Sequence, residues 1–348
     1  MLTANLRQAR EVILMAIQNN QSVMLLGDPG IGKTQMFSQI AERIEFACSI
    51  FEGPSLDPTD VRGVLIPVNG KSYFTKSPLL PIVEEDGEKG ILVIDELSSA
   101  LPSVQVSMHP LFLERRLGTH KLPAGWMPMA TGNYASNGAG AYNLLTALSD
   151  RVCIINVVPD VDVWKQDFAI PNGVHTMVLG YINFKPANLS TFAQRNKNQQ
   201  GKQFGTPRTH WEVSKVLHYH DKHPLSDNAL YIAIAGWVGE GLASEYMAFR
   251  ESYMKLPDPK DIYAGKDIIP TEPSVLWSLC SAIVLYLNGL NGSSLKKAIG
   301  RFLEYIQKLP DEFGILSLKD AFVTHSKSLV VMPEFKKLAK NYKFYFED

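Results

Sequence analysis

The stretch "GDPGIGKT", residues 27–34, directly follows the apolar run "SVMLL" at residues 22–26. It matches the pattern G-x-x-x-x-G-K-S/T between an expected strand and an expected helix, the setting in which such a loop binds phosphate. Glycines let the backbone curl so that successive N–H groups point inward, and the following helix N-terminus adds positive potential. The stretch predicts a phosphate-binding loop, with a glycine-rich β-turn as the alternative.

Two side chains at the end of this loop are expected to contact a nucleotide. Lys33 would touch the β- and γ-phosphates, and the Thr34 hydroxyl would hold Mg²⁺. The other expected nucleotide-binding residues of the loop are Gly27, Asp28, Pro29, Gly30, Ile31 and Gly32.

The composition describes a folded protein with little net charge. Of the 348 residues, 45% are hydrophobic and 20% are charged, and the formal net charge is −1. This composition lacks the polar bias of disordered chains, and the length suggests two or three compact units. The near-neutral charge supplies no global attraction for nucleic acid or an anionic membrane, so we expect neither as a partner.

The cysteines and two apolar segments bear on the compartment. Cys48, Cys153 and Cys280 are widely spaced, unlike a disulfide framework or a zinc-binding pair, and this favours a reducing cytoplasm. The N-terminal residues 1–17 have the spacing of an amphipathic helix rather than of a signal peptide. The apolar segment 274–290 is short for a bilayer crossing and contains polar residues, which favours a buried core helix.

The order of the remaining patterns predicts an α/β core followed by helices. Short β-rich runs alternate with helical patterns up to residue 158, as in a parallel sheet flanked by helices. The expected domains are a nucleotide-binding core at 1–158, a helical lid at 159–258 and a helical extension at 259–348. The expected strands are 22–26, 47–51, 91–95, 127–131 and 152–158.

An acidic pair follows the third expected strand in "ILVIDE", residues 91–96. A buried parallel strand delivers its C-terminal residues to the edge of the sheet that carries the phosphate loop. Asp95 can therefore reach the magnesium shell, and Glu96 can orient or deprotonate an attacking water. A strand that simply runs into an acidic turn is the alternative.

Three further polar residues are candidates for the same chemistry. Asn133 ends the apolar run "WMPMATGN" and would lie near the γ-phosphate, unless it belongs to an ordinary turn. Arg151, before the fifth strand, could reach a neighbouring subunit's site, or it pairs with Asp150 at the surface. Arg208 begins a helix of the second domain and could swing onto the γ-phosphate, with a solvated surface arginine as the alternative.

This ordered set of motifs resembles the AAA+ ATPases, specifically the MoxR-like branch, over about residues 5–260. The resemblance implies a five-stranded αβα core, a helical lid and a nucleotide-gated homo-oligomeric ring, usually a hexamer, with ATP and Mg²⁺ as cofactors. It also implies remodelling of protein complexes, often with a partner that carries a von Willebrand A domain. The motifs are "GDPGIGKT", "DPTDVRG", "ILVIDELSSALPSVQ", "LERRLGTHKLPAGW", "ATGN", "ALSDR", "TPRTHWEVSKVL" and "VGEGLASEYMAF".

The resemblance also assigns roles to the candidate residues. Each role is carried over from the matching motif of the family. The roles are Lys33 and Thr34 as Walker A, Asp95 and Glu96 as Walker B, Asn133 as sensor 1, Arg151 as arginine finger and Arg208 as sensor 2.

Two inserted segments, one turn and one proline add further predictions. Segments 57–77 and 118–126 lie where the family carries loops facing the pore, and Tyr73 and Phe74 in the first either grip a polypeptide or cover the sheet. Asn69 and Gly70 predict a hairpin turn. Pro110 predicts a kink or break in the expected helix 103–116, because it removes a backbone hydrogen bond.

The run "HYHDKH" at 218–223 places His218, His220 and His223 close together. The end of a helix explains these residues better than metal binding, because cations are favoured there.

Three functions remain open at this point. The first is an ATP-driven remodeller of protein assemblies. The second is a nucleic-acid motor of the McrB or helicase type, which shares the same nucleotide motifs. The third is a scaffold that binds ATP without hydrolysis, and Glu96 and Arg151 argue against it.

Overall fold

The computed structural model describes residues 2–134, 146–194 and 202–341. The chain divides into two compact units, the first reaching Asp160 and the second beginning at Val161. The first unit contains all strands of the main sheet, and the second is helical in its described residues. The predicted division of the helical part at residue 258 remains a prediction.

The first unit is built on a five-stranded parallel sheet in the order β2-β5-β8-β1-β9. This confirms the predicted α/β fold and all five predicted strands, with ends that differ by one residue. The strands are β1 (Val23–Gly27), β2 (Ala47–Glu52), β5 (Gly90–Asp95), β8 (Trp126–Gly132) and β9 (Cys153–Val157).

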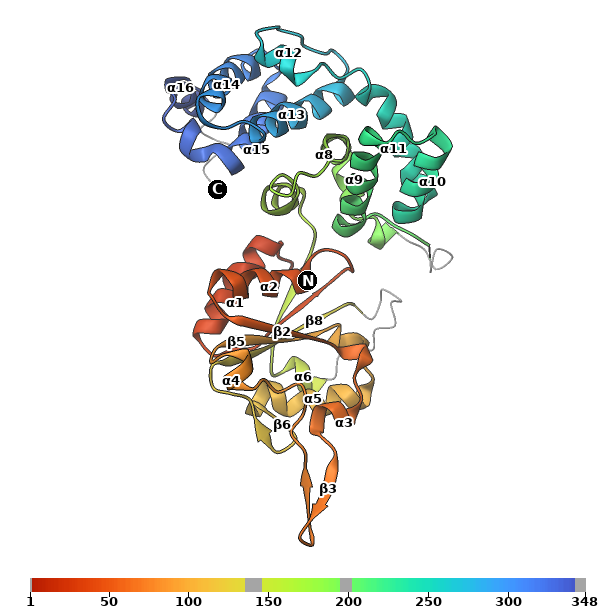
Figure 1. The fold of residues 1–348 in the computed structure, drawn as a ribbon, viewed down its shortest axis with the longest axis vertical. Coiled ribbons are helices and arrows are strands. Elements are labelled where there is room, and N and C mark those ends of the chain that lie inside the picture. Colours follow the sequence, from red (N-terminus) through yellow and green to blue (C-terminus); the bar gives the residue numbers. More distant parts are fainter. Residues whose placement is uncertain (1, 135–145, 195–201, 342–348) are drawn as a thin grey trace. The chain divides into compact units, whose positions relative to one another are not determined.

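Helices cover both faces of this sheet, which explains why the central strand β5 is apolar from Gly90 to Ile94. In β5, Ile91 and Val93 pack in one hydrophobic cluster, and Leu92 and Ile94 pack in the other. Successive side chains of a strand point to opposite faces, so a doubly covered strand buries all of them. Figure 1 shows α1 (Leu6–Gln18) and α2 (Lys33–Arg43) on one face, and α3 (Pro58–Arg62), α5 (Pro102–Glu114) and α6 (Thr146–Ser149) on the other.

The helix α5 remains continuous through Pro110, so the predicted break is not found, and the kink stays a prediction. Proline cannot donate to the carbonyl of the residue four positions earlier, here Val106. The side chain of Val106 is 54% exposed, so that side of the helix faces solvent and water can satisfy the carbonyl. The helix ends at Arg115, whose φ of 54° is left-handed and whose guanidinium donates to the Asn20 carbonyl at 2.6 Å.

Both predicted inserts contain a small antiparallel pair of strands. In the first, β3 (Leu65–Val68) pairs with β4 (Lys71–Phe74) across a turn at Asn69 and Gly70, which confirms the predicted hairpin. This hairpin projects from the rest of the first unit (Figure 1). The second insert contains β7 (His120–Lys121), which pairs with β6 (Arg116–Leu117) directly before it. The unit also contains η1 (Gly53–Ser55), α4 (Val83–Asp86) and η2 (Leu97–Ser99).

The second unit contains two hydrophobic clusters. One gathers side chains of α8 to α11, and the other gathers those of α12 to α16. Its elements are α7 (Val161–Trp164), the π-helix η4 (Lys165–Ala169), α8 (Thr176–Phe184), η5 (Pro186–Leu189), η6 (Phe192–Gln194), α9 (Pro207–Lys222), α10 (Asp227–Val238), α11 (Glu240–Tyr253), α12 (Pro259–Tyr263), α13 (Pro273–Asn288), α14 (Gly292–Ile306), α15 (Asp311–Leu329) and α16 (Pro333–Asn341).

The apolar segment 274–290 forms α13, and most of its side chains are buried in this unit. A buried core helix is what its sequence predicts. Among the described residues, no helix combines the length and apolar character needed to cross a membrane.

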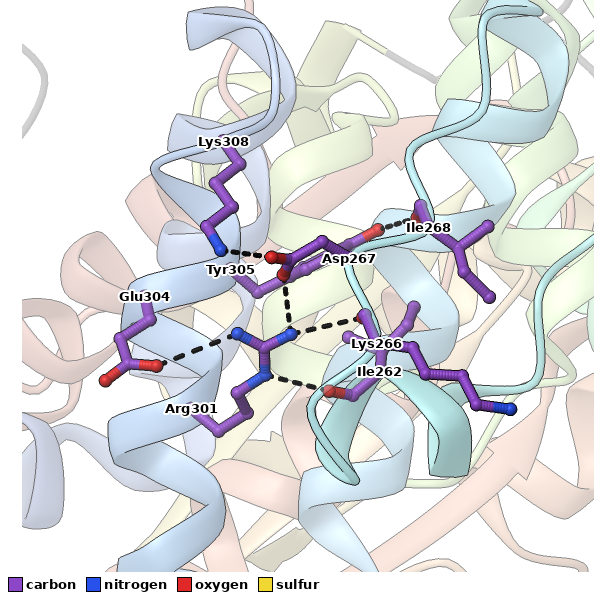
Figure 2. A network of polar contacts seen from close by, with 8 residues as sticks. All are labelled: Ile262, Lys266, Asp267, Ile268, Arg301, Glu304, Tyr305 and Lys308. Carbon is purple, nitrogen blue, oxygen red and sulfur yellow. Dashed lines mark hydrogen bonds and ion pairs between the residues drawn. The ribbon is translucent and has the colours of Figure 1, made fainter.

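The connector that follows α12 is held against α14 by Arg301 (Figure 2). The Arg301 guanidinium donates to the Ile262 carbonyl at 2.9 Å and to the Asp267 carboxylate at 2.7 Å. Lys308, just beyond the C-terminal end of α14, binds the same carboxylate. These contacts lower the pKa of Asp267, and they attach a segment without regular structure to the helical unit.

Candidate nucleotide-binding site

The C-terminal ends of three neighbouring strands bring the candidate residues to one edge of the sheet. In the register of the sheet, Leu26 of β1 lies beside Gly132 of β8, and Ile94 of β5 lies beside Ala130 of β8. The loop after β1, the acidic pair at the end of β5 and Asn133 after β8 therefore lie at the same edge. Ligands bind at this edge in open parallel sheets.

The loop after β1 requires glycine at defined positions. A Cβ atom at Gly27 would come within 2.4 Å of the Val157 carbonyl oxygen, so the close contact between β1 and β9 excludes a side chain. Gly30 and Gly32 have φ angles of 76° and 96°, which L-residues rarely adopt. The second of these is the N-cap of α2, so the loop leads directly into a helix N-terminus.

The side chain of Lys33 lies across this loop. Its ammonium donates to the carbonyls of Gly27 at 2.9 Å and Asp28 at 2.7 Å, and to Asn133 Oδ1 at 3.0 Å. The residue is only 8% exposed. The structure thus brings Lys33 and Asn133 together, as expected if both lie near one phosphate.

Thr34 and Asp95 are also in direct contact. The Thr34 hydroxyl donates to Asp95 Oδ1 at 2.6 Å. The Thr131 hydroxyl donates to the same oxygen and accepts the Glu96 backbone N–H at 3.0 Å. Hydroxyl and carboxylate oxygens are the ligand type that Mg²⁺ prefers, so this group fits the expected ion.

Glu96 has an unusual backbone at the end of β5. Its φ of 51° and ψ of 37° place it in the left-handed region, which is uncommon for a residue other than glycine. Such conformations concentrate at functional sites, because the surrounding structure must hold them against strain. The side chain is exposed, so its carboxylate is accessible to water.

Asn133 is fixed in place by Ser98 of η2. The Ser98 hydroxyl donates to the Asn133 carbonyl at 2.9 Å and accepts the Asn133 backbone N–H at 2.8 Å. Asn133 is 5% exposed, and a Cβ atom at Gly132 would come within 2.8 Å of the same hydroxyl. This close packing sets the position of the Asn133 amide relative to the loop.

The two arginines are not part of this group. Arg151 is half-buried in the turn before β9 and lies near His109 of α5, where its positive charge adds to burial in lowering the pKa of His109. Arg208 is exposed in the first turn of α9, in the second unit. The roles of Arg151 toward a neighbouring subunit and of Arg208 toward the γ-phosphate remain predictions.

Sequence reasoning missed two residues of this site, Thr131 and Ser98. Thr131 lies near the end of β8, two positions before Asn133. The signal in the sequence was one polar residue in an otherwise apolar run. In the sheet, Thr131 lies next to β5 at the level of Asp95. Ser98 could not have been found in this way, because its contact depends on the fold of η2.

Comparison with known proteins agrees with this geometry. Residues 22–151 match the family described as the AAA domain of the dynein-related subfamily. This part of the chain is therefore similar to an AAA domain. The match covers the phosphate loop, the acidic pair, Asn133 and Arg151.

Two curated relatives share part of their sequence with the protein. Midasin of Giardia intestinalis is 27% identical in an alignment of 216 residues that covers 58% of this chain and 4% of Midasin. The Holliday junction branch migration complex subunit RuvB of a Synechococcus strain is 28% identical over 164 residues, which are 43% of this chain and 40% of RuvB. The chain thus spans less than half the length of either relative.

Solved structures show only a loose likeness. The Thermotoga maritima RuvB Holliday junction branch migration motor has a TM-score of 0.38 and 15% identity, over 80% of each chain. NtrX of Brucella abortus in complex with ADP has a TM-score of 0.34 and 16% identity, over 99% of this chain and 69% of NtrX. Likenesses this low carry no argument about function.

Proposed function

We propose that the protein is a MoxR-like ATPase that hydrolyses ATP at the subunit interfaces of a ring and uses the energy to remodel a protein complex. One observation carries the nucleotide part of this proposal. Four predicted residues from three distant segments, Lys33, Thr34, Asp95 and Asn133, meet at the ligand edge of the sheet in two directly bonded pairs.

The loop residues would bind the triphosphate. Lys33 would exchange its bonds to the Gly27 and Asp28 carbonyls for phosphate oxygens, while the N–H groups at the start of α2 approach the same phosphates. Thr34 and Asp95 would hold Mg²⁺, which when bound neutralises negative charge on the phosphates.

The residues at the ends of β5 and β8 would act on the attacking water. Glu96 follows Asp95 directly and has an exposed carboxylate, so it can accept the proton of a water beside the γ-phosphate. The Asn133 amide, fixed by Ser98, would orient that water or the phosphate. Arg151 of a neighbouring subunit and Arg208 would then stabilise the charge that develops in transfer.

The projecting hairpin supports a protein as the substrate. Tyr73 is 50% exposed, so it does not cover the sheet, whereas Phe74 is partly buried. Exposed apolar side chains suit contact with a polypeptide. The others on and beside the hairpin are Val64, Leu65, Ile66 and Val68.

A nucleic-acid motor is the second candidate, because the curated relatives include RuvB. The formal charge of −1 speaks against it, since non-specific binding to nucleic acid depends on positive charge. ATPase activity measured with and without duplex and single-stranded DNA separates the two candidates. Stimulation that weakens steeply with salt would favour the motor.

The remodelling proposal is tested by trapping the ATP-bound protein. Tagged Glu96→Gln protein with ATP should retain a specific protein from a lysate of the source cells. Lys33→Ala protein under the same conditions should not. Recovery of the same proteins by both variants, or of DNA alone, would contradict a nucleotide-dependent protein remodeller.

A further inference from the structure

Three side chains with metal-binding atoms meet in the second unit, and none of them has a role in the nucleotide chemistry proposed above. They are His175, the N-cap residue of α8, and His218 and Asp221, which lie three positions apart on α9. One ligand atom from each lies within 4.8 Å of the other two. Side chains three positions apart share one face of a helix, so α9 presents an imidazole and a carboxylate together toward His175.

The backbone fixes the position of His175. Its N–H donates to Ser214 Oγ of α9 at 2.8 Å, and the Ser214 side chain is fully buried. The imidazole is itself buried, and its Nε2 lies 2.9 Å from Asp221 Oδ2. His175 and His218 also make an edge-to-face ring contact with centroids 4.9 Å apart.

His218 makes a hydrogen bond to a backbone carbonyl, of the kind that orients metal-bound imidazoles. Its Nε2 lies 2.9 Å from the Gly173 carbonyl, and a carbonyl can only accept, so Nε2 carries the proton. A neutral His218 ring therefore has a free lone pair on Nδ1. Bonds of this kind to a backbone carbonyl fix the tautomer and the direction of histidine ligands.

We propose that His175, His218 and Asp221 form a binding site for a divalent transition-metal ion that links the start of α8 to α9. Two imidazoles and one carboxylate suit Zn²⁺, Co²⁺ or Ni²⁺, whereas Mg²⁺ prefers oxygen ligands. The Asp221 side chain is 58% exposed, so water can complete the coordination. This site shares no residue with the one expected to hold Mg²⁺, Thr34 and Asp95.

Ion binding would change the hydrogen bonds of His175. At present its Nδ1 accepts the Met177 N–H at 3.1 Å, and its Nε2 faces Asp221. Ligation through Nε2 moves the ring proton to Nδ1 and ends the bond with Met177, and the ion takes the place of the Nε2 proton between His175 and Asp221. The hydrogen bond from the Met177 N–H that caps α8 would be lost, and the ion would hold the start of α8 instead.

The neighbouring histidines provide internal controls. The ring of His220 is already used, because Nδ1 accepts the Leu225 N–H at 3.0 Å and Nε2 lies 3.3 Å from Arg250. His223 lies just beyond α9, and its ring makes a tilted contact with the Tyr219 ring. Neither belongs to the group of His175.

The test is calorimetric titration of the chelator-treated, nucleotide-free full chain with Zn²⁺ in excess Mg²⁺. We expect one ion per chain. Asp221→Asn, which keeps an acceptor for His175, and His218→Ala should each weaken binding by at least about ten-fold. His223→Ala should bind like the unmodified protein, and thermal unfolding should confirm that all variants fold.

Substitution of Co²⁺ gives a second readout. Its visible absorption should show nitrogen ligation in the unmodified protein and in His223→Ala, and should change in His218→Ala. Absence of saturable Zn²⁺ binding would overturn the proposal. Undiminished binding by both Asp221→Asn and His218→Ala, or an equal loss in His223→Ala, would also overturn it.

Discussion

Lys33 and Asn133 are 100 positions apart in the sequence, and the Lys33 ammonium donates a hydrogen bond of 3.0 Å to the Asn133 side chain. Lys33 begins the helix after the phosphate loop, and Asn133 follows a strand that pairs with β1. The two residues meet because β1 and β8 pair in parallel. A ligand that draws the Lys33 ammonium away would therefore change the hydrogen bonding of Asn133, the residue expected to sense the γ-phosphate.

Thr131 is expected to stabilise the end of β5. Thr131→Val removes a donor to Asp95 and leaves the Glu96 backbone N–H without its acceptor. We expect the free energy of unfolding to fall by about 1–3 kcal/mol, the usual cost of an unsatisfied buried polar group. Thr131→Ser keeps the hydroxyl and should lose less. Urea unfolding measures both, and equal stability of the valine variant would remove Thr131 from this role.

Glu96 is expected to act in hydrolysis and not in binding. Glu96→Gln keeps the size of the side chain and removes the base, so turnover should fall by about 10²–10⁴-fold. Nucleotide affinity should stay unchanged. The matched control is Glu84→Gln, an exposed acidic residue of α4, which should hydrolyse ATP normally. Near-normal turnover by Glu96→Gln would show that another group activates the water.

Arg151 is expected to act on the nucleotide of a neighbouring subunit. Arg151→Ala protein should bind ATP normally and hydrolyse it poorly. Its mixture with Lys33→Ala protein should recover part of the activity, because some interfaces then combine an intact loop with an intact arginine. A mixture of Arg151→Ala with the Lys33→Ala/Arg151→Ala double variant is the control. Equal activity of the two mixtures would rule out action between subunits.

His210 makes the stability of the second unit depend on pH. Burial lowers the pKa of His210 from 6.5 to about 4, and its two ring nitrogens bind Tyr246 and the Asn188 carbonyl. Because the folded state holds the neutral ring, its contribution is complete above pH 6.5 and is lost as the pH falls toward 4.

The expected loss is about 1.4 kcal/mol per pH unit within this window. Urea unfolding at about pH 7 and about pH 5 should show it in the unmodified protein. His210→Gln cannot titrate and should show a smaller dependence. The same dependence in both proteins would assign the effect to other groups.

The parts of the fold that follow from local patterns could be predicted from the sequence. The strands β1 and β5 are rich in aliphatic residues because helices cover both faces of the sheet, and the loop after β1 needs glycines for positive φ angles and a close contact with β9. The position of Asp95 followed from the rule that parallel strands end at the same edge.

Contacts that depend on packing could not be predicted. The bonds of Ser98 to Asn133 require the fold of η2, and α5 continues through Pro110 at a position where Val106 faces solvent. The group of His175, His218 and Asp221 was likewise not predicted from the histidine run at 218–223. The sequence favoured no metal, and the fold sets one of these histidines beside His175, which is 43 positions earlier in the chain.

The central claim is that the loop after β1 holds a nucleotide through Lys33. The most direct test is a titration of the purified protein with fluorescent ATP, compared with Lys33→Ala and with Lys121→Ala, an exposed lysine of β7. We expect Lys33→Ala to weaken binding by at least about ten-fold, since a charge-assisted bond to phosphate is lost, and Lys121→Ala to bind normally. Equal affinity of Lys33→Ala and the unmodified protein would contradict the assignment of this site.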